Sequence, residues 1–143
     1  MIRRATPDDT GRLIEMGQRF VAETEYAGMI VARPERLAAT ISGVLANPDG
    51  VILVSDAEGV VSGMIAMLAY EHPYSGERMA FEVVWWVDPE ARGCGVRLLK
   101  AAEQWARDHG AVAMQMVAPN EQVGALYRRL GYSPVETSFQ RSL

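Results

Sequence analysis

A strand, a helix and a second strand follow one another in the second half of the chain, and this unit constrains the fold more than any other feature. The segment "RMAFEVVWWV" (78–87) is apolar at nearly every position, which predicts a central strand with both faces covered. A helix from about Val96 to His109 and a strand "AVAMQMV" (111–117) come next. Because such a connection is almost always a right-handed parallel crossover, we expect one parallel pair in an otherwise antiparallel sheet.

The first half of the chain has the periodicity of a short strand, two helices and a β-hairpin. The strand "MIRRA" precedes Thr6, Pro7 and Asp9, which together are typical of a helix start. A second helix begins near Pro34 and stops at "NPDG" (47–50). The period then changes to that of strands, and "VILVSD", "AEG" and "VVSGMIAMLAY" predict a hairpin with a tight turn.

The last part of the chain predicts a helix, "NEQVGALYRRL" (120–130), and a final strand, "YSPVETSFQRSL" (132–143). The expected order is therefore β-α-α-β-β-β-α-β-α-β. We predict an α/β fold with a mixed, mostly antiparallel sheet that splays at the parallel crossover. We find no repeat or linker in the sequence, so residues 1–143 are expected to form one domain.

Composition excludes several classes of protein. The net charge of −4 argues against a surface built for phosphate backbones, so no nucleic-acid partner is expected. The single cysteine, Cys94, excludes an intramolecular disulfide, and no ligand spacing suggests a metal. No run approaches the roughly 18 apolar residues of a membrane span, so we expect a cytoplasmic protein without a membrane partner.

Two glycines, Gly93 and Gly95, stand directly before the crossover helix. A nucleotide P-loop would need Lys and Ser or Thr after the last glycine, where Val96 and Arg97 stand. A dinucleotide-binding loop would need a third glycine at Leu98. Two interpretations remain open, namely a cradle for a pyrophosphate at the helix N-terminus and a tight turn without a ligand.

The loop and the segment after it resemble the GNAT superfamily of acyl-CoA-dependent N-acyltransferases. The resemblance rests on "WWVDPEARGCG", on "PNEQVGALYRRLGY" and on the predicted order of elements, and it covers nearly the whole chain. The loop departs from the family pattern: Arg97 stands where a small residue is usual, or the loop is about two residues short.

The resemblance implies acetyl-CoA as co-substrate, no metal, and a set of contact residues. The loop would hold the pyrophosphate of coenzyme A, the strand before it would pair with pantetheine, and Asn120 would be both a pantetheine contact and the N-cap of its helix. Tyr127 would be the acid near the sulfur, although a tyrosine on an apolar helical stripe can equally be a core residue. The expected coenzyme contacts are Trp85, Trp86, Val87, Arg92, Gly93, Cys94, Gly95, Val96, Arg97, Asn120 and Tyr127.

Glu82 is our first candidate for a base, because a carboxylate that interrupts an apolar strand is costly to bury. Pairing with an arginine is the alternative, and water could also serve as the base. Glu71, His72 and Tyr26 are candidates for the acceptor site. Trp85 and Trp86 should point to opposite faces of their strand, so at most one of them faces the ligand.

The sequence thus predicts an N-acetyltransferase that moves the acetyl group of acetyl-CoA directly to a primary amine of a small molecule or peptide. The alternative is an acyl-CoA-binding regulatory module without catalysis. Cys94, beside a helix N-terminus, could be a reactive thiol. A homodimer is a possible assembly.

Overall fold

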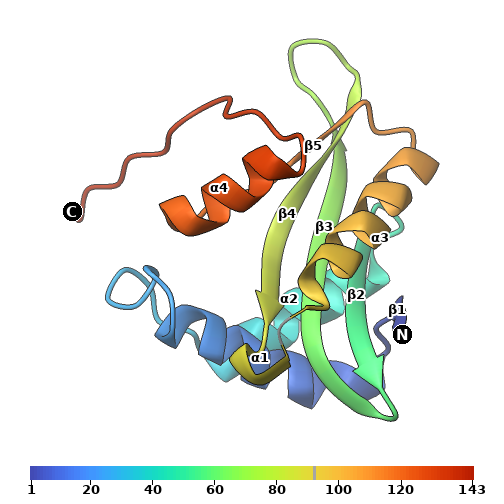
Figure 1. Ribbon diagram of the computed structural model, residues 1–143, viewed down its shortest axis with the longest axis vertical. Helices are drawn as coiled ribbons and strands as arrows, with labels where there is room; N and C mark the ends of the chain where they lie inside the picture. Colours follow the sequence, from blue (N-terminus) through green and yellow to red (C-terminus); the bar gives the residue numbers. More distant parts are fainter. Residues whose placement is uncertain (92) are drawn as a thin grey trace.

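The computed structural model describes residues 1–91 and 93–143, and its centre is a twisted five-stranded sheet in the order β1-β2-β3-β4-β5 (Figure 1). The strands are β1 (Ile2–Arg4), β2 (Gly50–Ala57), β3 (Val60–Glu71), β4 (Arg78–Val87) and β5 (Ala113–Gln115). Neighbours from β1 to β4 are antiparallel, whereas β4 and β5 are parallel. The predicted mixed sheet with one parallel pair is therefore confirmed.

The predicted hairpin is formed by β2 and β3. Its turn consists of Glu58 and Gly59, which both have positive φ (54° and 86°), and Ala57 pairs with Val60 across it. Two consecutive residues with positive φ are typical of the tight turn whose twist matches that of the strands.

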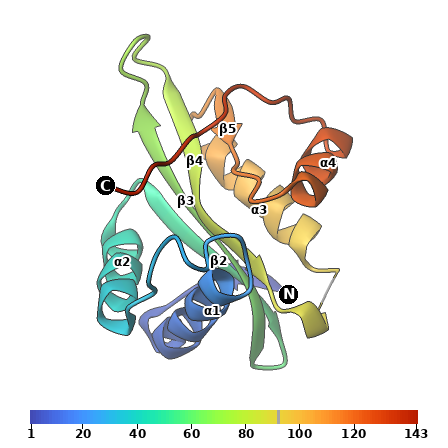
Figure 2. The same ribbon diagram turned by 90° about the vertical axis from the view of Figure 1, so that its left-hand side faces the viewer.

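Helices cover both faces of the sheet (Figure 2). Helices α1 (Thr10–Ala22) and α2 (Pro34–Ala46) pack on one face through a core that includes Leu13, Met16 and Ile41. Helix α3 (Gly95–Asp108) packs on the other face through Leu98, Leu99 and Trp105. Helix α4 (Glu121–Arg129) follows β5, and short 3-10 turns, η1 (Pro7–Asp9) and η2 (Pro89–Ala91), precede α1 and α3.

Strand β4 carries a bulge that the sequence did not indicate. Ala66 of β3 pairs with Val84, but the next residue, Met67, pairs with Glu82, so Val83 is an extra residue on β4. Side chains alternate along a strand, and one inserted residue reverses that alternation. Glu82 and Trp85, three positions apart, consequently face the same side of the sheet.

The predicted final strand is wrong for this chain. Residues 133–143 form no strand and are exposed at every position. A strand must pair its backbone N–H and C=O groups with a neighbour, and the tail leaves the sheet edge instead (Figure 1).

Close packing between β3 and α3 depends on Gly63, which is buried. A Cβ atom there would lie 3.1 Å from Leu98 and 3.2 Å from both Cys94 Sγ and Val87. We expect Gly63→Ala to lower the free energy of unfolding by about 1–3 kcal/mol, measured by urea denaturation, because overpacking strains a filled core.

Gly43→Ala is the matched control for this substitution. A Cβ atom at Gly43 would meet nothing within 4 Å, and the residue lies on the exposed side of α2. The alanine should stabilise the protein by about 0.5–1 kcal/mol through helix propensity. If both variants were stabilised, the packing between β3 and α3 would not be as tight as described.

Candidate active site

Glu82 and Tyr127 meet where β4 and β5 separate. The two strands pair only from Met79 to Phe81 on the β4 side. At the next residue the Glu82 carboxylate accepts a hydrogen bond from the backbone N–H of Val117 (2.9 Å). The Tyr127 hydroxyl donates to the Val117 carbonyl (3.1 Å) and lies 3.4 Å from Oε2 of Glu82. An acid and a phenol are thus held together at the point where the sheet opens.

The pKa values of these two groups are displaced in the same direction. Burial raises the pKa of Glu82 to about 7, against the opposing effect of its hydrogen bonds from Val117, Tyr127 and Trp85. Burial and the adjacent Glu82 carboxylate raise the pKa of Tyr127 far above its ordinary value. Near neutral pH, Glu82 can therefore exchange a proton readily while Tyr127 stays protonated and able to donate.

No arginine takes part in the hydrogen bonds of Glu82 within the described residues. The alternative that an arginine neutralises this carboxylate is therefore not what the structure contains. A half-buried carboxylate without a cationic partner is costly for stability, and such groups are concentrated at functional sites.

Trp85 extends the site along β4. Its ring stacks on Tyr127, with centroids 5.7 Å apart and an interplanar angle of 25°. Its indole N–H is buried without a hydrogen-bond partner among the residues that the structure describes. Trp86 faces the other side, where its ring meets Phe20 edge-on and its N–H donates to Asp88 (3.0 Å). The prediction that the two tryptophans point to opposite faces is confirmed, and Trp85 is the one beside Tyr127.

The edge of β4 beyond Phe81 has no paired strand on the β5 side in the described part of the chain, because β5 ends at Gln115. This stretch includes Trp85 and Val87. Apart from the Trp85 N–H, which donates to Glu82, its outward N–H and C=O groups have no strand partner and suit a ligand with an extended amide backbone.

The two glycines before α3 have different structural roles. Gly93 is exposed and has a φ of +115°, which favours glycine. Gly95 is the first residue of α3, where an added Cβ would lie 3.3 Å from the Trp85 ring and 3.4 Å from Val87. Gly95 thus lets the head of the helix approach β4 closely.

The head of α3 has no side-chain cap and no acidic residue in its first turn. Unpaired N–H groups and the helix dipole at such an end attract anions. Val96 is half-buried, Arg97 is exposed, and Arg92 lies outside the described residues.

Cys94 is buried in the core beside Gly63, so its backbone can face a ligand but its thiol cannot. The expectation of a reactive thiol is therefore not supported by its position.

Asn120 caps α4 as predicted, since its side chain accepts the N–H of Val123 (3.0 Å). Its amide also donates to Glu25 (3.3 Å), in the segment between α1 and α2. This contact brings that segment next to α4 and the candidate site. Tyr26 packs in the same segment against Phe20, with ring centroids 5.1 Å apart.

Glu71 and His72 lie at the far end of the β3–β4 hairpin. Glu71 is opposite Arg78 in the β3–β4 register. The backbone N–H of His72 donates to the Glu77 carbonyl (2.7 Å), and His72 Nδ1 accepts the N–H of Tyr74 (3.2 Å). Neither residue hydrogen-bonds to Glu82 or Tyr127 within the described residues. These two acceptor candidates are therefore not brought together with the proposed catalytic pair.

Asp88 is a buried acid that the sequence pattern did not single out. It follows β4 and binds the guanidinium groups of Arg12 and Arg19, in addition to the Trp86 indole. This network joins α1 to the end of β4. The signal was present in the sequence as an acidic residue directly after an apolar strand, but its two arginines are about 70 residues away and could not be assigned.

Residues 1–91 and 93–143 lack a metal-binding cluster and a membrane-spanning helix. No group of three or more His, Cys, Asp or Glu side chains there is placed to hold a metal ion. No helix there has the length and apolar character needed to cross a membrane.

Comparison with known proteins identifies the family. The sequence model of the acetyltransferase (GNAT) family matches residues 13–132. An aminoglycoside N(6')-acetyltransferase type 1 of Klebsiella aerogenes is 40% identical over 79 residues, which are 52% of this chain and 51% of that protein. The chain thus aligns with about half the length of this curated relative.

Solved structures share the fold over nearly the full length. A predicted acetyltransferase with acetyl-CoA from Clostridium acetobutylicum has a TM-score of 0.81 at 17% identity, with 99% of this chain and 95% of that chain covered. An aminoglycoside acetyltransferase from an uncultured soil metagenomic sample, in complex with trehalose, has a TM-score of 0.77 at 20% identity, with 100% and 95% covered. With the family match over most of its length, the chain belongs to the acetyltransferase (GNAT) family.

Proposed function

We propose that this protein, acting as one domain over residues 1–143, is an N-acetyltransferase that transfers the acetyl group of acetyl-CoA directly to a primary amine of a small molecule. The observation that carries the proposal is the contact between Glu82 and Tyr127 at the separation of β4 and β5. One group has a pKa of about 7 and the other stays protonated, which are the properties required of a base and an acid at neutral pH.

The residues around this pair fit the parts of coenzyme A. The uncapped head of α3 with the exposed Gly93 backbone suits a pyrophosphate, and the exposed Arg97 could add charge. The unpaired edge of β4 near Trp85 and Val87 suits the amide groups of pantetheine. Asn120 is a further candidate contact. Bound acetyl-CoA would supply the activated thioester.

The proposed proton transfers balance within the pair. An acceptor that arrives as an ammonium first releases one proton to solvent. Glu82 then takes one proton from the neutral amine as it attacks, directly or through water, and Tyr127 gives one proton to the departing sulfur. In the overall reaction a C–N bond forms and a C–S bond breaks. Since the Tyr127 hydroxyl lies 3.4 Å from Glu82, the protonated carboxyl can then return a proton to the phenol.

For the acceptor, we propose a cationic small molecule with several amines, such as an aminoglycoside. The sequence relationship to an aminoglycoside acetyltransferase supports this class. Glu25 adds to the support, because it is an acid held next to α4 by Asn120. A carboxylate at this position would attract a second ammonium group of the acceptor.

The rival proposal is a regulatory module that binds acyl-CoA without turnover. Both functions predict that acetyl-CoA raises the melting temperature. At a concentration 100 times Kd, binding should add about 2.7 kcal/mol to the stability. Absence of any thermal shift at saturation would contradict both functions.

An assay for turnover separates the N-acetyltransferase from the regulatory module. It measures the release of free thiol from acetyl-CoA with a panel of aminoglycosides, polyamines, amino acids and peptide N-termini. We expect turnover with at least one polycationic small molecule and weaker or no turnover with peptides. Binding without turnover on any amine of the panel would favour the regulatory module.

A further inference from the structure

Asp88 stands at the junction between β4 and the loop that precedes α3. Its side chain is buried, and its backbone is fixed on both sides. Its N–H donates to the Ser62 carbonyl of β3, and its carbonyl accepts the N–H of Ala91, both at 2.9 Å. The second of these hydrogen bonds closes the turn η2. Asp88 therefore sets the direction in which the chain leaves the sheet toward α3.

Two arginines of α1 hold the Asp88 carboxylate. Arg12 and Arg19 are separated by about two turns of helix, so both face the end of β4. Arg12 binds one carboxylate oxygen and also donates to the Val61 carbonyl (2.9 Å), while Arg19 binds the other oxygen (3.0 Å). The Trp86 indole donates to the same carboxylate (3.0 Å). We call Asp88, Arg12 and Arg19 the α1 clamp.

Arg19 extends the α1 clamp onto the turn η2, which lies beside α1 at the end of β4 (Figure 1). Its guanidinium reaches the carboxylate of Glu90, the middle residue of η2, at 3.3 and 3.4 Å. Both arginines of the clamp also pair with acids of their own helix, Glu15 and Glu23. Their charges are thus compensated, so their role is to hold the turn and not to attract a phosphate.

Little chain separates the α1 clamp from the head of α3. The turn η2 ends at Ala91 and α3 begins at Gly95, so only residues 92–94 connect them. At the α3 end the chain is held by packing, because Cys94 is buried and Gly95 lies against β4. A connection this short has little reach once both of its ends are fixed. The position of the exposed Gly93 backbone therefore depends on the clamp at one end and on this packing at the other.

We propose that the α1 clamp positions the coenzyme loop: Asp88, held by Arg12 and Arg19, places the Gly93 backbone where it binds the pyrophosphate of the coenzyme. The inference rests on the proposed use of acetyl-CoA. Asp88 acts through the backbone of Gly93, so it is a positioning residue and not a catalytic one. It should contribute to recognition of the pyrophosphate and leave the transfer step unchanged.

The first test is the affinity for coenzyme A, measured by isothermal titration calorimetry on the full chain. We expect Asp88→Asn to raise Kd by about 10- to 100-fold, because a small misplacement of a positioned group has effects of this size. Removing the charge of Asp88 frees two arginines near the loop, so attraction by charge alone would lower Kd instead. An unchanged or lower Kd would overturn the role of the clamp alone. A wild-type protein that binds no coenzyme A would overturn the proposed function with it.

The second test compares two donors, since S-acetylpantetheine carries the thioester without the pyrophosphate. We expect Asp88→Asn to lower kcat/KM for acetyl-CoA by about 10- to 100-fold, but kcat/KM for S-acetylpantetheine by no more than about twofold. Equal losses with the two donors would show a general disturbance of the fold and overturn the proposal.

Arg19→Gln keeps the proposal testable if Asp88→Asn does not fold. This variant leaves Arg12 bound to Asp88, so the buried carboxylate retains a cationic partner. It should show the same selective loss for acetyl-CoA on a smaller scale, about 3- to 10-fold. Equal kcat/KM values of this variant and the wild type with acetyl-CoA would overturn the proposal.

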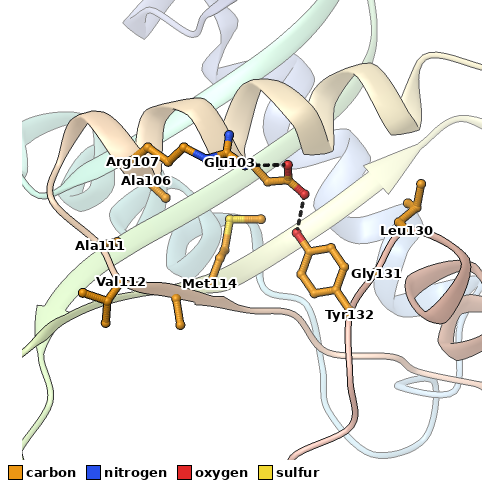
Figure 3. A pocket seen from close by; sticks show the side chains of 10 residues that line it. Glu103, Ala106, Arg107, Ala111, Val112, Met114, Leu130, Gly131 and Tyr132 are labelled. Atoms are coloured by element: carbon orange, nitrogen blue, oxygen red, sulfur yellow. Dashed lines mark hydrogen bonds and ion pairs between the residues drawn. The ribbon is translucent and has the colours of Figure 1, made fainter.

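Two other carboxylates that hold arginines away from η2 provide the controls. Asp9, also buried, binds Arg3 at 2.8 and 2.9 Å before the start of α1. Glu103, in the second half of α3, pairs with Arg107 and accepts the Tyr132 hydroxyl at 2.8 Å (Figure 3). Asp9→Asn and Glu103→Gln should lower the melting temperature but keep the wild-type Kd for coenzyme A and the wild-type ratio of kcat/KM between the two donors. A selective loss for acetyl-CoA in these controls, equal to that of Asp88→Asn, would overturn the assignment to the α1 clamp.

Discussion

Glu82→Gln is expected to lower kcat/KM at neutral pH by about 10²–10³-fold, because general-base catalysis contributes on this scale. The substitution is nearly isosteric, and the amide oxygen can still accept the Val117 N–H that holds the carboxylate in place (2.9 Å). What is lost is the ability to take a proton from the acceptor. Steady-state rates of thiol release with saturating acetyl-CoA measure the effect.

The pH dependence gives this substitution a signature. With the pKa of Glu82 at about 7, its ionised, active fraction rises with pH and levels off above pH 7. Log kcat/KM should therefore rise more steeply below pH 7, where this limb adds to the rise from the acceptor amine, than above it. In Glu82→Gln this limb should disappear, leaving only the rise from the acceptor amine at higher pH. Glu77→Gln, an exposed carboxylate in the β3–β4 loop, is the control and should keep the wild-type profile. An unchanged profile in Glu82→Gln would remove Glu82 from the mechanism and favour water as the base.

The contribution of Glu82 to folding stability should change with pH in the opposite direction to its contribution to kcat/KM. The folded-state pKa of Glu82 lies above its ordinary value of 4.5, so the folded protein binds more protons than the unfolded chain between pH 4.5 and about 7. Its contribution to stability is therefore present at low pH and lost as pH rises through this range. Glu82→Gln should unfold at a higher urea concentration than the wild type at pH 8, which would distinguish a lost catalytic group from a damaged fold.

Much of the fold follows from local sequence pattern, because periodicity and turn residues act over short distances. The strand 78–87 and the glycine turn after Ala57 are found where the pattern predicts them. The extra residue Val83 was not predictable, since a bulge depends on which β3 residue stands opposite. That bulge is what brings Glu82 and Trp85 to one face, so the candidate site depends on register that the sequence does not reveal.

The loop before α3 illustrates the same limit. Two glycines so close together after a strand suggest one common role, yet the structure gives them different ones: Gly93 provides a positive φ, and Gly95 provides space for Trp85. The prediction of a final strand over residues 132–143 is wrong for a related reason. Its alternating pattern is real, but pairing requires an edge, and within one chain the tail does not lie along one.

Tyr127→Phe is expected to lower kcat by about 100-fold while changing KM for acetyl-CoA by no more than a few fold. The phenylalanine ring can keep the stacking on Trp85 (5.7 Å), so the packing around the site is retained. The missing hydroxyl removes the proton donor for the departing thiolate, and an unassisted thiolate is a poorer leaving group. Initial rates with varied acetyl-CoA and a fixed acceptor give the two constants separately.

Tyr70→Phe is the matched control for Tyr127→Phe. The Tyr70 hydroxyl also donates a hydrogen bond between elements of the sheet, to Gln115 (3.3 Å), but it does not contact Glu82. Each substitution should cost about 1 kcal/mol of stability for one hydrogen bond, whereas only Tyr127→Phe should lose turnover. Equal activity of the two variants would show that Tyr127 is a packing residue of α4, and the acid would then have to be sought among the groups that face the unpaired edge of β4.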